Sequence, residues 1–131
     1  MTNAGITVLM PISKLTQGNY NTQMDINRRR IFLDCQKVLP AIKHSSGTSL
    51  INMSSVASMR GIAFVYSMVK AGIHMLSKSV AIEHVAHRVR CNSVYPRLID
   101  TNMQDDAQHD NAEANAELST MVPLARIAKP D

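Results

Sequence analysis

The chain has 131 residues, of which 45% are hydrophobic and 18% charged, and its formal net charge is +4. This composition is typical of one globular domain with a core and argues against a disordered chain. The densest basic run, residues 28–30, is too short to indicate a nucleic-acid partner, and the few aromatic rings offer little for base stacking.

Cysteine and histidine usage gives no sign of a disulfide framework or a metal site. Cys35 and Cys91 are far apart in apolar neighbourhoods, which favours a reduced intracellular protein, and no C-x-x-C or H-E-x-x-H pattern occurs. His84 and His87 are more simply an exposed polar turn. The first ten residues resemble no signal peptide, and no stretch approaches the ~20 apolar residues of a membrane span. We therefore expect a soluble, cytoplasmic protein with neither a metal nor a membrane partner.

The first half of the chain predicts a turn, a loop and a helix. Residues 3–5 (NAG) form a small turn, and the polar residues 13–21 predict a loop. A helix is predicted over residues 21–43, with apolar positions among polar ones, and Pro40 should bend or end it because proline lacks a backbone donor.

The second half predicts two strands around a long helix. Residues 48–53 are a short run consistent with a buried strand, and residues 54–61 form a loop. Residues 65–87 carry apolar side chains every three or four positions, which predicts a helix, and residues 89–95 predict a strand that Pro96 ends. Residues 105–115 predict a polar, acidic loop, and a short helix is expected over residues 112–121.

This order predicts an α/β fold. Strands that alternate with long helices indicate βαβ crossovers and a parallel sheet. Two strands are few for a parallel sheet, which normally has both faces covered. The pattern therefore indicates part of a larger fold.

Tyr66 and Lys70 form the pair with the most specific chemistry. Four residues apart at the start of the long helix, they lie on one face, one turn apart. A tyrosine titrates near ~10, and a nearby ammonium favours the phenolate and should lower that pKa toward neutral pH. Such a pair also occurs by chance on helices, so it needs supporting motifs.

Four further motifs stand around this pair: residues 3–5 (NAG), residues 51–58 (INMSSVAS), residues 89–103 with VRCNSVYP followed by IDTNM, and residues 122–131 (VPLARIAKPD). In this order and near these spacings, the chain resembles the short-chain dehydrogenase/reductase family over almost its whole length. The resemblance implies a partial, Rossmann-like, three-layer αβα, doubly wound parallel sheet. It also implies that residues 1–131 are a single partial NAD(P)-binding domain, its catalytic portion.

The resemblance assigns catalytic roles to four residues. Tyr66 would be the proton donor and acceptor, and Lys70 would lower its pKa and bind the nicotinamide ribose. Ser55 would hydrogen-bond the substrate oxygen. Asn27 matches a helical asparagine whose backbone helps to hold a water beside the lysine.

The resemblance also assigns residues that border NAD or NADP: Asn3, Ala4, Gly5, Tyr66, Lys70, Pro96, Ile99 and Thr101. The residues themselves leave alternatives. Asn27 could be a polar residue on an exposed helix face, Ser54 could be the oxygen-binding serine, and Thr101 could be an ordinary helix N-cap.

The chain departs from the family pattern in several places. The family's T-G-x-x-x-G-x-G loop, which binds pyrophosphate, is absent, since none of the five glycines forms it. We therefore expect an internal piece of a protein about twice as long. Ser55 and Tyr66 are about two residues closer than usual, and Arg97 stands where a glycine is usual and could crowd the nicotinamide. Arg30 and Asp34 replace usually small residues.

The implied function is the NAD(P)-dependent interconversion of a secondary alcohol and a ketone, in a homo-oligomer (dimer or tetramer). A hypothesis from another class is a non-catalytic, truncated remnant that acts, if at all, through dimer-type packing of its two long helices. A basic nucleic-acid module is the weakest alternative. The substrate, and the choice between NAD and NADP, are not specified by these residues.

Overall fold

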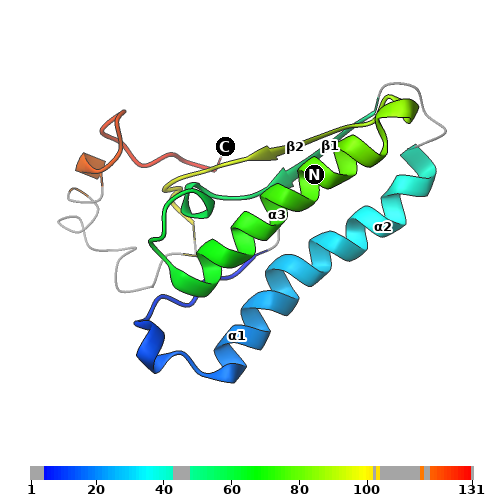
Figure 1. Ribbon diagram of the computed structural model, residues 1–131. Helices are drawn as coiled ribbons and strands as arrows, with labels where there is room; N and C mark the ends of the chain where they lie inside the picture. The colour runs from blue at the N-terminus through cyan, green and yellow to red at the C-terminus, as the bar shows by residue number, and fades with distance from the viewer. Residues whose placement is uncertain (1–4, 43–47, 102, 104–115, 117–118, 131) are drawn as a thin grey trace. The chain divides into compact units, whose positions relative to one another are not determined.

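The computed structural model describes residues 5–42, 48–101, 103, 116 and 119–130 (Figure 1). By its internal contacts the chain forms two compact units, Met1–Tyr95 and Pro96–Asp131, and each is described by itself. The first unit contains the three α-helices and both strands, in the order α1 (Gln17–Gln23), α2 (Arg30–Ile42), β1 (Ser49–Met53), α3 (Phe64–Glu83) and β2 (Arg90–Val94).

The first helical region begins earlier than the sequence predicts. α1 starts after Thr16, whose hydroxyl accepts the backbone N–H of Asn19 (3.1 Å), while the Asn19 side chain accepts the backbone N–H of Thr16 (3.0 Å). This reciprocal cap places helix where residues 13–21 predicted a loop. It uses asparagine in place of the usual Glu or Gln, so the sequence pattern did not reveal it.

A π-helical segment, Met24–Arg29, joins α1 to α2, so one helical path runs from Gln17 to Ile42. Pro40 lies inside the last turn of α2, exposed, and the helix ends two residues after it. The helix thus continues through Pro40 to the last described residue before the gap at 43–47, and the prediction that this proline bends or ends the helix stays a prediction.

The two predicted strands form a parallel pair, as expected. β1 and β2 are in register from Ser49 opposite Arg90 to Met53 opposite Val94, and α3 makes the crossover between them. Leu50 and Cys91 are register partners that face the helices, whereas Ile51 is partly exposed on the other face. β1 is thus buried on one face, not on both.

Both long helices pack on the same face of this sheet (Figure 1). The core between them consists of residues from α2, α3 and both strands: Ile31, Cys35, Leu50, Val69, Ile73, Val80 and Cys91. The α3 members recur at helical spacing, as the sequence predicts. In the described part of the first unit, helix covers one face of the sheet, so two of the three layers implied by the resemblance are seen there.

Among its described residues, the second unit contains one short strand-like contact. Ile99 and Ala128 form a parallel bridge, in which Asp100 N–H donates to the Ala128 carbonyl (2.9 Å) and Ala128 N–H donates to the Leu98 carbonyl (3.2 Å). The sequence did not predict this pairing. The predicted loop over 105–115 lies outside the described residues, as does most of the predicted helix over 112–121.

Candidate active site

Tyr66 and Lys70 occupy the first two turns of α3, as the sequence predicts. The start of this helix is held by Ser67, whose hydroxyl accepts the Ala63 N–H (3.1 Å) and donates to the Arg60 carbonyl (3.4 Å). Lys70 is only 4% exposed, and its Nζ lies 5.5 Å from the centroid of the Tyr66 ring. The same Nζ donates to the Met53 carbonyl at the end of β1 (2.9 Å). The ammonium is thus fixed between the strand end and the tyrosine.

Ser55 lies on the chain before Tyr66, at the end of β1. It follows β1 directly and caps the 3₁₀ helix Val56–Ser58, where its hydroxyl accepts the Ala57 N–H (3.2 Å). The Ser55 side chain also hydrogen-bonds the Tyr66 side chain. The short connection between the two residues therefore does not keep them apart.

The neighbouring serine has a different role. The Ser54 hydroxyl donates to the Lys70 backbone carbonyl (2.9 Å), and its N–H donates to the Val94 carbonyl (2.9 Å), so Ser54 ties β1 to both α3 and β2. Of the two serines left open by the sequence, the structure brings Ser55 to Tyr66 and commits Ser54 to the fold.

The electrostatics of the pair differ from the simple expectation. Burial raises the pKa of Tyr66, and the hydrogen bond from Ser55 only partly offsets this. Burial also lowers the pKa of Lys70. The spacing of Tyr66 and Lys70 predicts that the ammonium lowers the pKa of the tyrosine, but loss of solvent disfavours the charged form of both groups and is the largest effect on each. The protein alone therefore favours a neutral phenol.

Asn27 is fully buried, so its interpretation as a residue on an exposed face is wrong. It lies in the π-helix, where its side-chain oxygen accepts the Ile6 N–H (2.9 Å). Its amide nitrogen donates to the Ile6 carbonyl (2.9 Å) and to the Gln23 carbonyl (2.9 Å). The side chain therefore fastens the extended segment that follows Gly5 to the helix, as a paired strand would.

Gln23, which the sequence analysis did not single out, extends this fastening. Its side-chain oxygen accepts the Val8 N–H (3.3 Å), and the side chain is fully buried. Its amide nitrogen and the Thr7 hydroxyl are buried polar atoms without a hydrogen-bond partner. The sequence signal for this contact is a spacing. Gln23 and Asn27 are one helical turn apart, and their partners Val8 and Ile6 are two residues apart in the extended segment.

The remaining residues predicted to border a cofactor fall in different places. Asn3 and Ala4 lie outside the described residues, and Gly5 begins the extended segment held by Asn27. Pro96, Ile99 and Thr101 belong to the second unit. There the Thr101 hydroxyl donates to the Ile99 carbonyl (3.5 Å). Most of the residues that directly follow Thr101 lie outside the described residues, so its alternative role as a helix N-cap stays a prediction.

Two of the departures from the family pattern compensate each other. Arg30 Nε and Asp34 Oδ2 lie 3.9 Å apart on the solvent side of α2, four residues apart, where opposite charges attract weakly. Arg97 is partly buried in the second unit.

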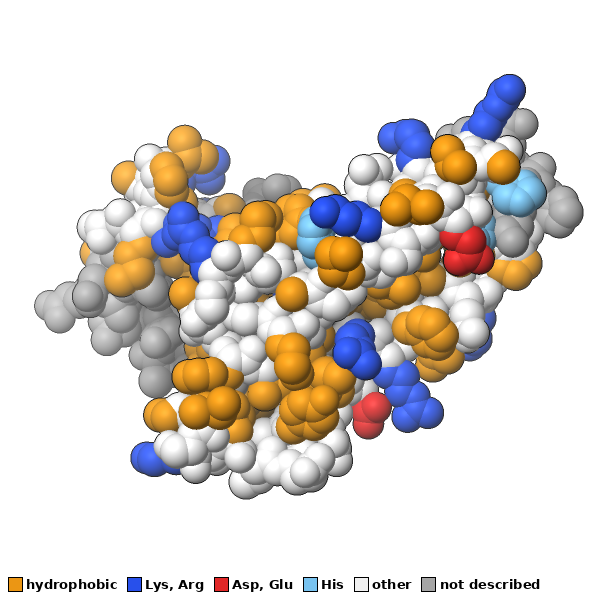
Figure 2. All heavy atoms as spheres, viewed as in Figure 1, with side chains coloured by type: hydrophobic (Ala, Val, Ile, Leu, Met, Phe, Trp, Pro, Cys, Tyr) orange, Lys and Arg blue, Asp and Glu red, His pale blue; other side chains and the backbone are white. Residues whose placement is uncertain are grey.

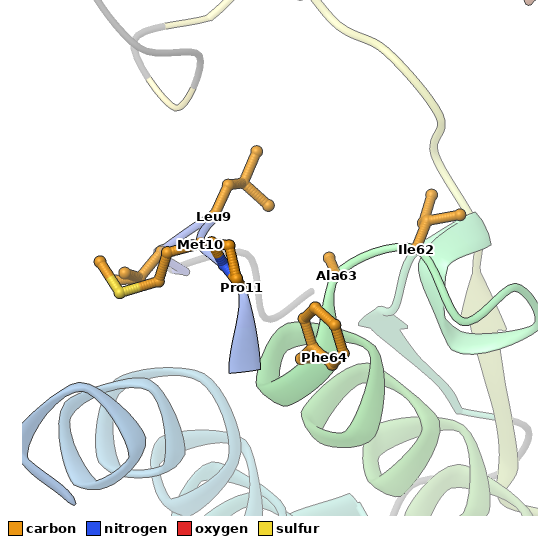
Figure 3. A pocket seen from close by; sticks show the side chains of 7 residues that line it. Leu9, Met10, Pro11, Ile62, Ala63 and Phe64 are labelled. Atoms are coloured by element: carbon orange, nitrogen blue, oxygen red, sulfur yellow. The ribbon is translucent and has the colours of Figure 1, made fainter. Parts of the chain in front are cut away.

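A shallow hollow of about 300 Å³ opens beside the start of α3 (Figure 3). Its walls come from the extended segment and from the loop that leads into the helix. All seven lining residues are apolar: Val8, Leu9, Met10, Pro11, Ile62, Ala63 and Phe64. On the face shown in Figure 2, hydrophobic side chains gather over the end of the unit where α1 and the first turn of α3 lie.

No helix in the described part of the chain is long and apolar enough to cross a membrane. Among the same residues, no group of His, Cys, Asp and Glu side chains is placed to hold a metal ion.

The donors at this site fit a nicotinamide nucleotide. Lys70 carries three N–H donors, and the Met53 carbonyl takes one of them, which leaves donors for ribose hydroxyls beside Tyr66. The fit concerns the nicotinamide end, since the sequence has no glycine-rich phosphate loop.

Comparison with known proteins identifies the family. The family model described as enoyl-(acyl carrier protein) reductase matches residues 1–131. L-xylulose reductase from Bos taurus is 32% identical over 97% of this chain and 53% of its own length. A chloroplastic tropinone reductase homologue from Arabidopsis thaliana is 30% identical over 98% of this chain and 40% of its own length. The chain thus spans about half the length of the curated relatives that it matches.

A solved structure shows the same fold. The gluconate 5-dehydrogenase from Burkholderia cenocepacia, in complex with NADP and tartrate, superposes with a TM-score of 0.88 over 97% of this chain and 50% of that chain, at 23% identity. The full-length family match, the relatives and the Rossmann-type fold agree, and the chain belongs to the short-chain dehydrogenase/reductase family of oxidoreductases.

Proposed function

We propose that the protein interconverts a secondary alcohol and a ketone with NAD or NADP, using Tyr66 as the proton donor and acceptor. The observation that carries this proposal is the meeting of Ser55, Tyr66 and Lys70 in one largely buried group. Ser55 hydrogen-bonds Tyr66, and the Lys70 Nζ lies 5.5 Å from the centroid of the Tyr66 ring. Family membership supports the reaction class, and the NADP complex of the gluconate 5-dehydrogenase with this fold supports the cofactor class.

Each side chain has a defined task in this proposal. Ser55 hydrogen-bonds the substrate oxygen and holds it next to the Tyr66 hydroxyl. In the direction of ketone reduction, Tyr66 gives its proton to that oxygen as negative charge develops there. The raised pKa of Tyr66 suits this direction, because a neutral phenol is the form that can donate.

Lys70 acts on the tyrosine and on the nucleotide. Its remaining N–H groups hold ribose hydroxyls, and its positive charge stabilises the phenolate left after proton transfer. A nicotinamide held there would supply or accept the hydride. The Met53 carbonyl holds the Lys70 amine in place before the substrate binds. The side chain therefore loses little further conformational freedom when it carries out either task.

The test is the substitution Tyr66→Phe in a chain that turns over a small ketone with NADH or NADPH. Removing the proton donor should lower kcat by about 100-fold or more, because general acid–base catalysis contributes about 10²–10⁴-fold. The dissociation constant for the cofactor, measured by its fluorescence, should change less than about twofold, since ribose contacts of Lys70 remain.

Tyr20→Phe is the matched control, because Tyr20 lies exposed on α1 and its substitution removes the same hydroxyl. It should leave kcat unchanged. A Tyr66→Phe chain with the turnover of the unmodified protein would refute the role given to Tyr66.

A second candidate function has one observation in its favour. α2 and α3 carry large apolar side chains on their outer surfaces, among them Phe32 and Leu33 on α2 and Met75 and Ile82 on α3. Exposed apolar helix faces favour association with another chain. A non-catalytic remnant that pairs through these helices would show a concentration-dependent mass in solution but no binding of cofactor at millimolar concentration.

A further inference from the structure

The first turn of α3 carries Tyr66, and this turn begins without the usual side-chain cap. We propose that Ser67 is a positioning residue for the reaction: it closes this turn against strain at Phe64 and so keeps the Tyr66 hydroxyl beside Ser55. This inference rests on the proposed function, because it gives Ser67 a task only through the role of Tyr66 as proton donor and acceptor.

The start of α3 lacks an N-cap side chain. Its first three residues are Phe64, Val65 and Tyr66. The N–H groups of a first helical turn have no acceptor inside the helix, so a polar side chain at the N-cap usually supplies one. Here the N-cap is Ala63, whose methyl group cannot accept a hydrogen bond. Val65 packs against the core, but this contact leaves the backbone of the turn uncapped.

The backbone at Phe64 adds strain to the same turn. Its φ is 25°, a conformation that residues with a Cβ atom rarely adopt and that is an outlier for a bulky side chain. Residues 59–63 connect the preceding 3₁₀ helix to α3, and within them the Ile62 N–H donates to the Arg60 carbonyl (2.7 Å) in a three-residue turn. Figure 3 shows Phe64 at the start of the helix, where this tight connection ends. Such strain persists only where surrounding contacts enforce it.

Ser67 supplies contacts that enforce it. Its N–H donates to the Ala63 carbonyl (3.1 Å) and its hydroxyl accepts the Ala63 N–H (3.1 Å), so one residue binds both polar backbone groups of the N-cap. The same hydroxyl donates to the Arg60 carbonyl (3.4 Å), which also accepts from Ile62. Ser67 thus ties the tight connection to the helix. Without its hydroxyl, relief of the strain at Phe64 would favour opening of the first turn.

Opening of this turn would move Tyr66 and leave Lys70 in place. The Tyr66 side chain hydrogen-bonds Ser55, at the end of β1, and it lies inside the turn. Lys70 lies one turn further on. There the Met53 carbonyl accepts from its amine, and the Ser54 hydroxyl donates to its backbone carbonyl. Loss of the hydroxyl that closes the turn should therefore affect proton transfer and not the ribose contacts proposed for Lys70.

The test is Ser67→Ala, which removes the hydroxyl but keeps a residue of high helix propensity. In turnover of a small ketone with NADH or NADPH, kcat should fall by about tenfold, because misplacement of a catalytic group removes part of the roughly 10²–10⁴-fold that general acid–base catalysis contributes. The dissociation constant of the cofactor should change less than about twofold. A loss of cofactor binding as large as the loss of kcat would contradict a role specific to Tyr66.

A tyrosine titration gives a readout that needs no turnover. Burial raises the pKa of Tyr66 in the unmodified chain. With tyrosine labelled with carbon-13 at Cζ, the Tyr66 signal follows this ionisation by NMR, and its loss in Tyr66→Phe assigns it. In Ser67→Ala the pKa of Tyr66 should fall toward its ordinary value of about 10, because an opened turn returns the phenol to water.

Phe64→Gly tests the strain itself. Glycine adopts a positive φ without steric cost, so Ser67→Ala/Phe64→Gly should have a kcat at least about threefold above that of Ser67→Ala. Phe64→Ala removes the same ring but keeps the Cβ atom, so Ser67→Ala/Phe64→Ala should regain none of the lost kcat. Equal kcat values in the two double variants would show that strain at Phe64 does not open the turn.

Two controls separate the hydroxyl from general stability. Ser79→Ala is the matched control, because Ser79 is exposed on the same helix and its hydroxyl also donates to a backbone carbonyl, that of Met75 (3.1 Å). It should leave kcat unchanged. Val80→Ala removes part of the core, so it should lower the melting temperature without changing the kcat of the folded chain.

The two readouts distinguish this inference from the proposed function. If Tyr66→Phe abolishes turnover but Ser67→Ala changes neither kcat nor the pKa of Tyr66, the inference is overturned and the proposed function stands. If Ser67→Ala lowers the pKa of Tyr66 in a chain that turns over no alcohol or ketone, the proposed function is refuted, and Ser67 remains the residue that holds Tyr66 in place.

Discussion

Lys70 is the residue at which burial and function are in conflict. Its amine is almost completely removed from water, and a single carbonyl, that of Met53, is the hydrogen-bond acceptor that fixes it in the chain. Because burial disfavours the ammonium form, the pKa of Lys70 is lowered. A buried amine that is only partly compensated lowers the stability of the fold, and ribose hydroxyls would add the missing acceptors.

This conflict predicts a pH dependence of stability. The unfolded lysine titrates near 10.5, and the folded pKa lies below that value. Between the two, the unfolded chain binds more protons, so the contribution of Lys70 to the free energy of unfolding rises with pH. Below the folded pKa the cost is fully present and constant. The free energy of unfolding of the unmodified chain, minus that of Lys70→Met, should therefore increase as the pH rises toward 10.5.

Urea unfolding at a series of pH values measures this difference. Tyr66, whose raised pKa acts in the opposite direction, lies against Lys70, so both chains of the comparison carry Tyr66→Phe to remove its titration. Lys78→Met, on the exposed side of α3, corrects for the loss of one charge. If the free energy of unfolding of the chain with Lys70, minus that of Lys70→Met, decreased with rising pH, a lowered pKa for this lysine would be contradicted.

At this scale the sequence predicts which residues matter but not their partners. The spacing of Tyr66 and Lys70 places them on one helical face, and both lie there. That the Met53 carbonyl accepts from Lys70, and that Ser54 bonds the α3 backbone, depends on how β1 meets α3. The sequence also predicts the wrong direction for the shift of the Tyr66 pKa, because local spacing contains no information about burial.

At the scale of elements, helices and strands with strong periodicity were predicted closely. The predicted strands and the long α3 helix agree with the structure within a few residues, since each has an apolar pattern with a clear period. The start of α1 was missed because its residues are polar and its cap is formed by the unusual Thr16–Asn19 pair. Polar composition does not separate a loop from a capped, exposed helix turn.

The π-helix and the extended segment before α1 form a unit that the sequence did not predict. Four residues of helix rise about 6 Å, and two residues of an extended chain rise about 6.6 Å, so side chains one turn apart can meet alternate backbone groups. Gln23 and Asn27 use this match to bond Val8 and Ile6. The segment that forms one wall of the hollow is thus positioned by two helical amides.

The two amides should differ greatly in their effect on stability. Asn27→Leu removes three hydrogen bonds, one buried and two partly buried, and takes away the partner of both polar backbone groups of Ile6, which should cost about 3 kcal/mol. Gln23→Met removes one long bond and also an amide nitrogen that has no partner, so it should cost less than about 1 kcal/mol. Thermal and urea unfolding measure both. Equal costs would mean that Gln23 Nε2 has a partner in solution.

At the scale of the whole molecule, one core holds the first unit together. Its seven members join α2, α3 and both strands, so none of these elements buries its apolar face alone. The relatives are about twice as long, and the resemblance could identify the fold because the matched half contains a complete crossover. Whether this half is stable by itself separates the enzyme hypothesis from that of a non-catalytic remnant.

The two cysteines provide that measurement. Cys35 on α2 and Cys91 on β2 are 2% and 8% exposed, both hydrogen-bond Asn52, and burial raises the pKa of each thiol. Since the exposed thiolate is the reactive form, Ellman's reagent should modify neither thiol in native buffer. As urea is added, both should react in one phase whose rate follows unfolding, because opening one side of the shared core opens the other. Cys91→Ala assigns the remaining signal to Cys35.

Immediate reaction of both thiols without urea would show that the core does not form in the isolated chain, and the remnant hypothesis would then be favoured. Reaction of Cys91 alone would show that β2 separates from a helical pair that stays packed.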